Sequence, residues 1–360
     1  MSVRAKQYVG SISFPVLSIL GALILGAIMI TAMGYDAPFA YRSLWGGAFG
    51  SVHAFTETLV QTTPLLFTAV SYAIAYKCGL INLGAEGQLY MGAMTGAFVG
   101  ARFGALPGGL LFVLLCGFLG GALWGFITGA LRMRFGASEL ITTIMLNYIA
   151  FEFLSFAITA PHFRDITPGA APRMAAVAEA VRLPVLLPQT RLHLGLVFAL
   201  LAILAYYIFM WKTTKGYEMR VVGLNAGAGQ YAGMNIGRNG VLAITLAGGV
   251  AGLGGIVNVI GLQPFLTEGF SNNFGFSGIA VALLGGCHPV GILVSGVFFG
   301  ALNAGGMRMQ LMAQVPAAAI LLIQGMIIVF AVSRELFIYF GRTGKSLFTK
   351  KHRAGGEGDA

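Results

Sequence analysis

The stretch CGLINLGAEGQLYMGAM, residues 78–94, places one carboxylate, Glu86, and two amides, Asn82 and Gln88, inside a chain that is otherwise strongly apolar. Ionisable groups at bilayer depth are costly and usually mark a pathway or a pairing. Glycines interrupt the stretch at four positions, so a regular helix through it is not expected. A broken helix is tolerated inside a membrane only where protein or a water-filled cavity satisfies its backbone. The stretch therefore predicts a helix break at membrane depth.

Several roles remain open for the polar residues of this break. Asn82, Glu86 and Gln88 are candidates for lining a solute pathway. Alternatively, Lys77 closes a salt bridge with Glu86, or Glu86 accepts hydrogen bonds from backbone amides in the break.

Composition places the chain in a membrane. Charged residues make up 9% of the 360 residues, against about 25% in an ordinary soluble domain. The net charge of +10 does not indicate a nucleic-acid partner, because the basic residues punctuate apolar runs. Three separated cysteines and five scattered histidines show neither a disulfide framework nor the spacing of a metal site.

Apolar runs near the roughly 20 residues that cross a bilayer define the predicted spans. These are 14–34, 57–76, 82–101, 106–130, 140–160, 193–211, 240–261, 274–288, 289–306 and 313–333. With the N-terminus inside, 15 of the 22 Lys and Arg residues lie on the inner side, as topology rules require. We therefore predict an all-α polytopic protein of about ten transmembrane helices, N-in and C-in. The membrane domain, 14–335, lies between a cytoplasmic N-terminus, 1–13, and a basic tail, 336–360, and carries an external loop at 161–192.

Glycine-rich faces predict close helix packing. Gly117, Gly121, Gly125 and Gly129 recur every four residues on one helical face, and Gly248 and Gly252 repeat the pattern in the seventh span. Such seams let helix backbones approach closely in lipid.

Two further polar clusters are candidates for a solute route. In the fifth span Asn147 shares a face with Glu139 and Thr143, while Tyr148 begins a different stripe. An amide and a phenol near mid-span suit a neutral solute with ring nitrogens and hydroxyls, although Asn147 equally suits hydrogen bonding between helices.

The second cluster is EGFSNNFGFSG, 268–278, at the outer mouth. Asn272, Asn273 and Phe274 together suit a base-like ring through stacking and hydrogen bonds. Ordinary interfacial aromatic residues are the alternative.

The connection 213–235 predicts short helices that dock on a partner. Its apolar positions repeat every three or four residues, too interrupted by glycine to cross a membrane. Such helices rest on the bilayer or enter a partner's groove. The candidates for contact with such a partner are Gly216, Tyr217, Glu218, Arg220, Gly223, Leu224 and Tyr231.

No catalytic motif is present. GRTGKS, 341–346, imitates a phosphate loop but has Tyr339 where that pattern needs glycine, and it follows a membrane helix instead of a strand. The chain is therefore expected to bind no cofactor and to contain no catalytic residue of its own.

Several segments resemble one family. GLINLGAEGQLYMGA (79–93) is similar to the G-x-x-N-[IL]-G-x-E-G-Q signature of bacterial ABC-importer permeases in the branched-chain amino acid and simple-sugar superfamily. ELITTIMLNYIAF (139–151) and GFSGIAVALLGGCHPVGI (275–292) resemble segments of its nucleoside branch, the BMP type. TTKGYEMRVVGLNAGAGQYAGMN (213–235) is similar to the family's ATPase-coupling loop. TRLHLG (190–195), just after the external loop, is also similar to the family.

The resemblance, over about residues 60–335, implies a type II importer-like permease in the bacterial inner (cytoplasmic) membrane. Its implied partners are a second homologous permease, an ABC ATPase subunit that uses ATP and Mg²⁺, and an extracytoplasmic substrate-binding lipoprotein. Nucleosides are the implied cargo. A ribose-type sugar or branched-chain amino acid permease is the alternative within the family, and a proton-coupled secondary transporter using Glu86 and Glu152 is the alternative from another class.

Overall fold

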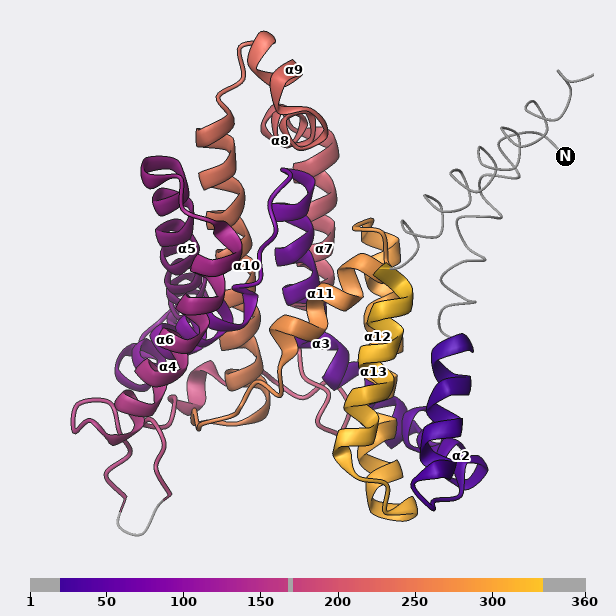
Figure 1. Cartoon of the computed structure of the whole chain (residues 1–360). Coiled ribbons are helices and arrows are strands. Elements are labelled where there is room, and N and C mark those ends of the chain that lie inside the picture. Colours follow the sequence, from indigo (N-terminus) through magenta and orange to yellow (C-terminus); the bar gives the residue numbers. More distant parts are fainter. Residues whose placement is uncertain (1–19, 168–170, 333–360) are drawn as a thin grey trace, which may run out of the picture. The chain divides into compact units, whose positions relative to one another are not determined.

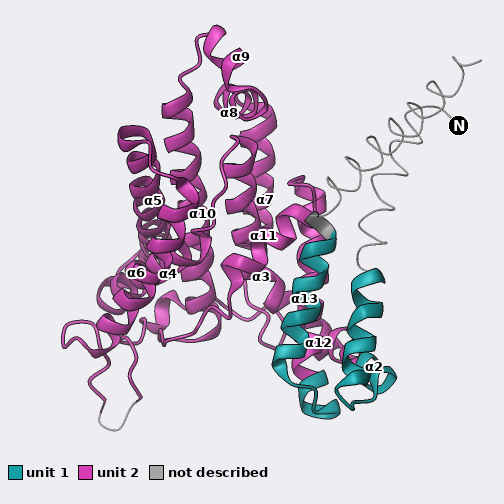
Figure 2. Cartoon of the chain, in the orientation of Figure 1, with its two compact units in different colours: residues 1–43, 309–360 teal, residues 44–308 magenta. Residues whose placement is uncertain are grey.

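The computed structural model describes residues 20–167 and 171–332 (Figure 1). The predicted segments 1–13 and 336–360, the phosphate-loop imitation and the start of the first span lie outside these residues. The chain divides into two compact units, residues 1–43 with 309–360, and residues 44–308 (Figure 2). In the first unit, the Tyr41 hydroxyl donates to the Leu23 carbonyl at 2.7 Å.

The regular secondary structure of the described residues is helical apart from two isolated β-bridges. The helices are α2 (Ala37–Phe49), α3 (Val52–Lys77), α4 (Ala85–Phe103), α5 (Gly109–Phe135), α6 (Glu139–Thr159), η1 (Glu179–Val181), α7 (Gly195–Lys212), α8 (Thr214–Leu224), α9 (Ala226–Tyr231), α10 (Ile236–Leu262), α11 (Phe274–Leu284), α12 (Pro289–Ala313) and α13 (Ala317–Val332). An apolar helix also covers Leu20–Ala32. Each predicted span therefore coincides with a helix, and the chain is an all-α polytopic membrane protein.

Among the described helices, six are long and apolar enough to cross a membrane by length and composition: α3, α5, α6, α7, α10 and α12. The predicted span 274–288 differs, because α11 has only 11 residues. At 1.5 Å per residue it covers about 16 Å, roughly half of the ~30 Å hydrocarbon core. Asn273, with φ +58°, begins α11, and Gly286, with φ +62°, lies in the turn after it. The span is therefore a half-helix. Helix α2 was not predicted from the sequence.

Two long helices are each followed by a break and a shorter helix (Figure 1). After α3 the chain is non-helical at 78–84 and then forms α4, and after α10 it is non-helical at 263–273 and then forms α11. Helix α4 packs against α10, and α11 packs against α3. The arrangement brings the starts of α4 and α11 together inside the second unit.

The predicted glycine seam joins α4, α5 and α10. A Cβ on Gly121 would lie 2.2 Å from the Gly248 carbonyl oxygen, and a Cβ on Gly252 would lie 2.6 Å from the Gly117 carbonyl oxygen. A Cβ on Gly92 of α4 would lie 2.1 Å from the Gly252 Cα. Three backbones therefore meet at Gly252, where no side chain fits.

Replacing Gly252 with alanine is expected to lower the yield of folded protein severalfold, because its Cβ overlaps backbone atoms of α5. Overpacking of this kind costs about 1–3 kcal/mol or more. The matched control is Gly325→Ala on α13, where an added Cβ meets nothing within 4 Å. Size-exclusion chromatography of the two detergent-solubilised variants measures the difference. Equal yields would show that the seam tolerates a methyl group.

The segment 161–192 is tied to the end of α10. The Met174 amide donates to the Leu266 carbonyl at 2.9 Å, and the Leu183 amide donates to the Ile260 carbonyl at 3.0 Å. Within the segment, hydrogen bonds from Thr167, and then from Arg173, lower the pKa of Asp165 to about 2. These contacts hold the segment against the 263–273 break.

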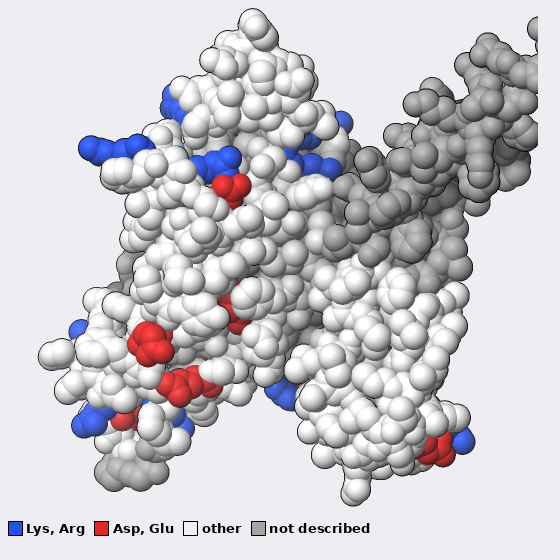
Figure 3. Space-filling model, viewed as in Figure 1, with Lys and Arg blue, Asp and Glu red and all other residues white. Residues whose placement is uncertain are grey.

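Basic side chains lie at the two ends of the second unit. Figure 3 shows Lys and Arg side chains near the α8–α9 end and near the opposite end, with none visible across the middle of this face. This distribution matches a helical bundle whose apolar middle faces lipid.

Candidate functional site

Glu86 joins the two helix breaks. It is 2% exposed and occupies the first turn of α4. The Gly275 amide, in the first turn of α11, donates to Glu86 Oε2 at 2.5 Å. The Ser271 hydroxyl and the Phe276 amide lie beside the same carboxylate. Because the first amides of a helix have no partner within it, an anion at that end stabilises the helix. The carboxylate therefore accepts from the backbone of α11, a partner on another helix that the sequence did not identify.

Glycine at 275 makes this contact possible. A Cβ there would lie 2.3 Å from the Glu86 amide nitrogen and 2.6 Å from Oε2. The α11 backbone therefore rests directly on the first turn of α4.

Asn82 and Gln88 bond to each other across the break. Asn82 Nδ2 donates to Gln88 Oε1 at 2.9 Å, and Gln88 Nε2 donates to Asn82 Oδ1 at 3.2 Å. Asn82 Oδ1 also accepts from the Gly84 amide at 3.0 Å. Both side chains are buried. The pair replaces the helical bonds that the break interrupts.

Asn147 of α6 bridges the same break from outside. Its Oδ1 accepts from the Gly87 amide at 2.8 Å, and its Nδ2 donates to the Leu83 carbonyl at 2.9 Å. One amide side chain thereby satisfies a backbone donor and a backbone acceptor that a continuous helix would have paired internally. Hydrogen bonding between elements, one of the two roles predicted for Asn147, is thus present in the structure.

Replacing Asn147 with leucine is expected to lower folded yield and transport together. Two buried backbone groups lose their partner, at about 1–3 kcal/mol for each. The control is Thr142→Val on the same helix, because the Thr142 hydroxyl is exposed and donates to the Ser138 carbonyl of its own helix. The measurement is the midpoint of thermal unfolding of the purified protein beside uptake per folded molecule. Loss of uptake at an unchanged midpoint would contradict this purely supporting role.

The other predicted pathway residues are placed differently. Tyr148 is 60% exposed and packs edge-on against Phe151, away from the face that carries Asn147. Asn272 and Asn273 are exposed, with φ of +30° and +58°. Phe274 is buried, and its carbonyl accepts from the Thr68 hydroxyl at 2.9 Å. The break thus gathers Asn82, Glu86, Gln88 and Asn147, while Tyr148 lies apart.

A cleft of about 80 Å³ lies beside the start of α11. Asn272 and Phe274, both predicted, line it together with residues that the sequence did not single out. These are Val60, Gln61, Arg191, Asn258, Val259, Leu262, Gln263, Phe265 and Phe270. Asn258 was missed although it is the one amide within the apolar run 240–261, a signal that was available.

Helices α8 and α9 form the predicted module after α7. Thr213 caps α8 by accepting from the Gly216 amide at 3.1 Å. A Cβ on Gly216 would lie 2.1 Å from the Phe209 carbonyl oxygen, so α8 folds tightly onto the end of α7.

Gly223 connects this module to the α3–α4 break. A Cβ on Gly223 would lie 2.3 Å from the Lys77 carbonyl oxygen and 2.8 Å from the Gly79 amide nitrogen. Gly79 itself has φ +77°, a conformation that favours glycine. The α8 backbone therefore touches the residues that lead directly into Asn82 and Glu86.

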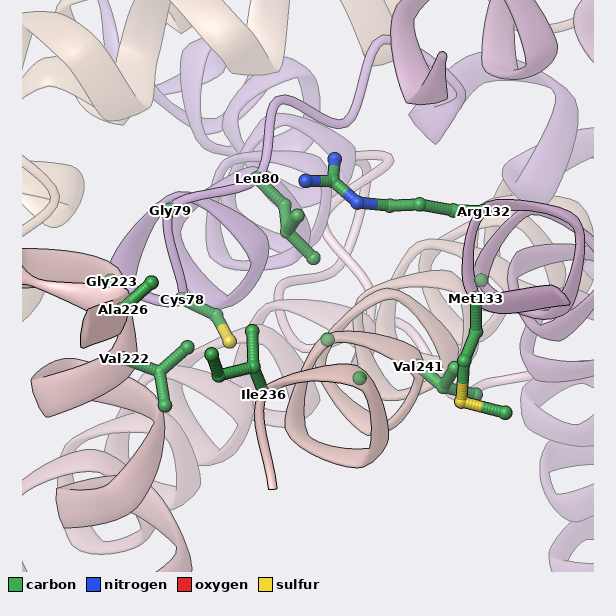
Figure 4. A pocket seen from close by; sticks show the side chains of 13 residues that line it. Cys78, Gly79, Leu80, Arg132, Met133, Val222, Gly223, Ala226, Ile236 and Val241 are labelled. Atoms are coloured by element: carbon green, nitrogen blue, oxygen red, sulfur yellow. The ribbon is translucent and has the colours of Figure 1, made fainter. Parts of the chain in front are cut away.

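A cavity of about 400 Å³ lies between this contact and the ends of α5 and α10. In Figure 4 the Arg132 side chain extends from α5 toward Leu80, with Gly79 and Gly223 on neighbouring segments. Arg132 also pairs with Glu139 at the start of α6. Residues of the module and of the break thus line the same pocket.

Charged residues fasten α8 to its neighbours. Glu218 accepts from Lys215 Nζ at 2.8 Å and from Asn239 Nδ2 of α10 at 3.2 Å. The Lys215 hydrogen bond, followed by that from Asn239, lowers the pKa of Glu218 below its ordinary value. The Arg220 guanidinium lies 5.8 Å from the Trp211 ring centroid. Helix α8 thus contacts α10 through Asn239 and α7 through Trp211.

The same module exposes large apolar side chains. Leu224 is 89% exposed and Tyr231 is 97% exposed, and Tyr217 is more than half exposed. Exposed apolar residues in a cluster mark an interaction surface. The arrangement suits a partner that pulls or pushes on α8 and α9.

A polytopic helical bundle with buried polar groups at a helix break suits a membrane transport protein. The chain belongs to the family described as branched-chain amino acid transport system / permease component, whose model matches residues 54–332. It is therefore a multi-pass membrane protein of that permease family.

Relatives span most of the chain. It is 35% identical over 326 residues to the guanosine ABC transporter permease protein NupP of Bacillus subtilis. The aligned region covers 89% of this chain and 92% of the relative. It is 36% identical over 300 residues to the nucleoside ABC transporter permease protein NupB of Lactococcus lactis, covering 81% and 82%. It is 33% identical over 334 residues to the glucose ABC transporter permease protein TsgB13 of Haloferax volcanii, covering 90% and 87%. No solved structure is significantly similar to the chain.

Proposed function

We propose that this chain is the permease subunit of an ATP-driven importer of nucleosides in the bacterial cytoplasmic membrane. The observation that carries the proposal is the 35–36% identity, over more than four fifths of the chain, to permeases named for guanosine and nucleoside transport.

The proposed assembly contains a second homologous permease, an ABC ATPase subunit and an extracytoplasmic substrate-binding lipoprotein. ATP and Mg²⁺ belong to the ATPase, and this chain binds no cofactor. The exposed side chains of Tyr217, Leu224 and Tyr231 favour α8 and α9 as the ATPase-binding surface.

The proposed mechanism is a rigid linkage. Closure of the ATPase subunits moves α8, and Gly223 passes this movement to Lys77 and Gly79. The break at 78–84 then shifts, and Glu86 carries the shift to the start of α11. Alternating access follows from the movement of such packed elements between two arrangements.

A sugar importer is the second candidate, because the 33% identity to a glucose permease spans 90% of the chain. The two are separated by reconstituting the chain with its co-purifying subunits into proteoliposomes. Labelled guanosine, glucose and leucine are then offered separately with ATP. Uptake of guanosine supports the proposal, while uptake of glucose without any nucleoside establishes the second candidate.

A further inference from the structure

The cleft beside α11 is a built polar site. Gln61 of α3, Asn258 of α10 and Asn272 of the 263–273 break line it from three different elements. Phe265, Phe270 and Phe274 supply its aromatic wall. Its volume of about 80 Å³ holds two or three water molecules at ~30 Å³ each. In this conformation it admits the edge of a ring or a hydroxyl group.

Asn258 has an acceptor with no partner. Its side chain is 7% exposed, and among the residues that the structure describes none donates to its Oδ1. Buried polar groups in proteins almost always have a hydrogen-bond partner. Asn258 lines the cleft, but its Oδ1 is closed to water in this conformation, so a solute donor reaches this acceptor only when the walls of the cleft move apart.

The charges at the rim compensate each other. Arg191 Nη1 lies 3.6 Å from Glu57 Oε1, and Gln61 Nε2 donates to the same Glu57 oxygen at 3.3 Å. The rim therefore offers no net charge to attract an ion. Together with the aromatic wall, this favours a neutral solute with N–H or O–H donors over a nucleotide or an amino acid.

The cleft lies directly against the Glu86 junction. Phe274 lines the cleft, and the next residue, Gly275, donates to Glu86. A solute in the cleft therefore touches the segment whose position is set by the start of α4.

We propose that the cleft formed by Gln61, Asn258 and Asn272 is the point where the permease itself recognises its solute. When the cleft opens far enough to expose Oδ1, Asn258 accepts a hydrogen bond from an N–H or O–H of a neutral heterocyclic or hydroxylated solute, whose ring lies against the phenylalanine wall. The inference deepens the proposed function and rests on it for the choice of a nucleoside as the probe.

The first test replaces Asn258 with leucine in the complete complex. Guanosine uptake per folded complex is expected to fall about tenfold, as for a buried acceptor that loses its donor. The solute-free ATPase rate is expected to stay within twofold of the unmodified complex. Asn258→Asp retains an acceptor at the same place and is expected to keep more uptake than the leucine variant. Thr245→Val on the same helix, whose hydroxyl donates to the Val241 carbonyl, is the control.

The second test remains valid even if the protein does not fold with a substitution at Asn258. In an Asn272→Cys variant, an impermeant thiol reagent is expected to label position 272 from outside, and guanosine is expected to slow the labelling. The unmodified chain, with Cys78, Cys116 and Cys287, measures the background. Unchanged uptake in Asn258→Leu, or labelling that guanosine does not slow, would overturn the inference.

These outcomes differ from failure of the proposed function, in which the unmodified complex takes up no nucleoside at all. Both tests are then repeated with the solute that the unmodified complex does take up. Uptake by Asn258→Leu and protection of the Asn272→Cys variant from labelling again decide the inference.

Discussion

Replacing Gly223 with alanine is expected to abolish ATP-driven uptake, or lower it at least about tenfold, while the chain still inserts and still binds its ATPase. The added Cβ would lie 2.3 Å from the Lys77 carbonyl oxygen, so α8 and the start of the break must separate. A displacement that costs about 1–3 kcal/mol is enough for such an effect. Because Gly223 lies at the end of α8, the rest of the docking surface remains.

The measurement compares uptake with ATP hydrolysis in the same reconstituted complex. Gly223→Ala is expected to hydrolyse ATP without moving solute. Gly46→Ala on α2, where an added Cβ lies 3.6 Å from the nearest atom, Arg308 Nη1, is the matched control and is expected to transport normally. If Gly223→Ala moves solute at the normal rate for each ATP hydrolysed, the contact with Lys77 is not the route of coupling.

Replacing Glu86 with leucine is expected to have the second large effect. The Gly275 amide would lose its acceptor inside the bundle, and a buried unpaired group costs about 1–3 kcal/mol. The first turn of α11 would also lose the negative charge that its dipole favours. Folded yield and uptake are expected to fall below about a tenth of normal, since the starts of both α4 and α11 meet at this side chain.

Glu86→Gln separates hydrogen bonding from charge. Glutamine keeps an acceptor oxygen within reach of Gly275, so this variant is expected to retain a substantial part of the uptake. A proton-coupled carrier that used Glu86 would lose all uptake in Glu86→Gln, because glutamine cannot exchange a proton. Uptake is measured across the pH range with folded protein quantified in each sample. Complete loss in a well-folded Glu86→Gln protein would favour the carrier mechanism.

The sequence predicted the helices well because lipid imposes a simple rule. A run of about 20 apolar residues has few alternatives to a membrane helix, and every predicted span lies on a helix. The predicted span 274–288 is the exception, because its helix α11 is shorter than the predicted crossing. There Gly285 and Gly286 lie inside an apolar run, and composition alone does not distinguish a short helix with a turn from a complete crossing.

The break at 78–84 was predictable for the same local reason, since glycines beside buried polar residues disfavour a regular helix. The rest of the stretch differs from the prediction, because Gly87 and Gly92 lie within the regular helix α4. The partners of these residues were not predictable. Glu86 and Gly275 are 189 positions apart in the chain, and Asn147 reaches Leu83 and Gly87 from another helix. Contacts at such separation depend on the packing of whole helices, which no local pattern encodes.

Some roles of glycine were likewise predictable from the sequence, and others appear only in the folded structure. The repeat from Gly117 to Gly129 predicts a packing face from its spacing alone. Gly223 has no such repeat, and its importance appears only when α8 lies against Lys77 and Gly79. Asn258 could have been noticed as a lone amide in α10, but its free acceptor is a property of the folded cleft.

The central claim is that an ATPase acting on α8 and α9 drives the break at Glu86. The most direct measurement is guanosine accumulation in proteoliposomes prepared with and without the ATPase subunit, with ATP and Mg²⁺ on the ATPase side and with a protonophore added to half of the samples. Accumulation is expected only when the ATPase subunit is present, and the protonophore is expected to have no effect. Accumulation by this permease in the absence of the ATPase, driven by a proton gradient and abolished by the protonophore, would contradict the account.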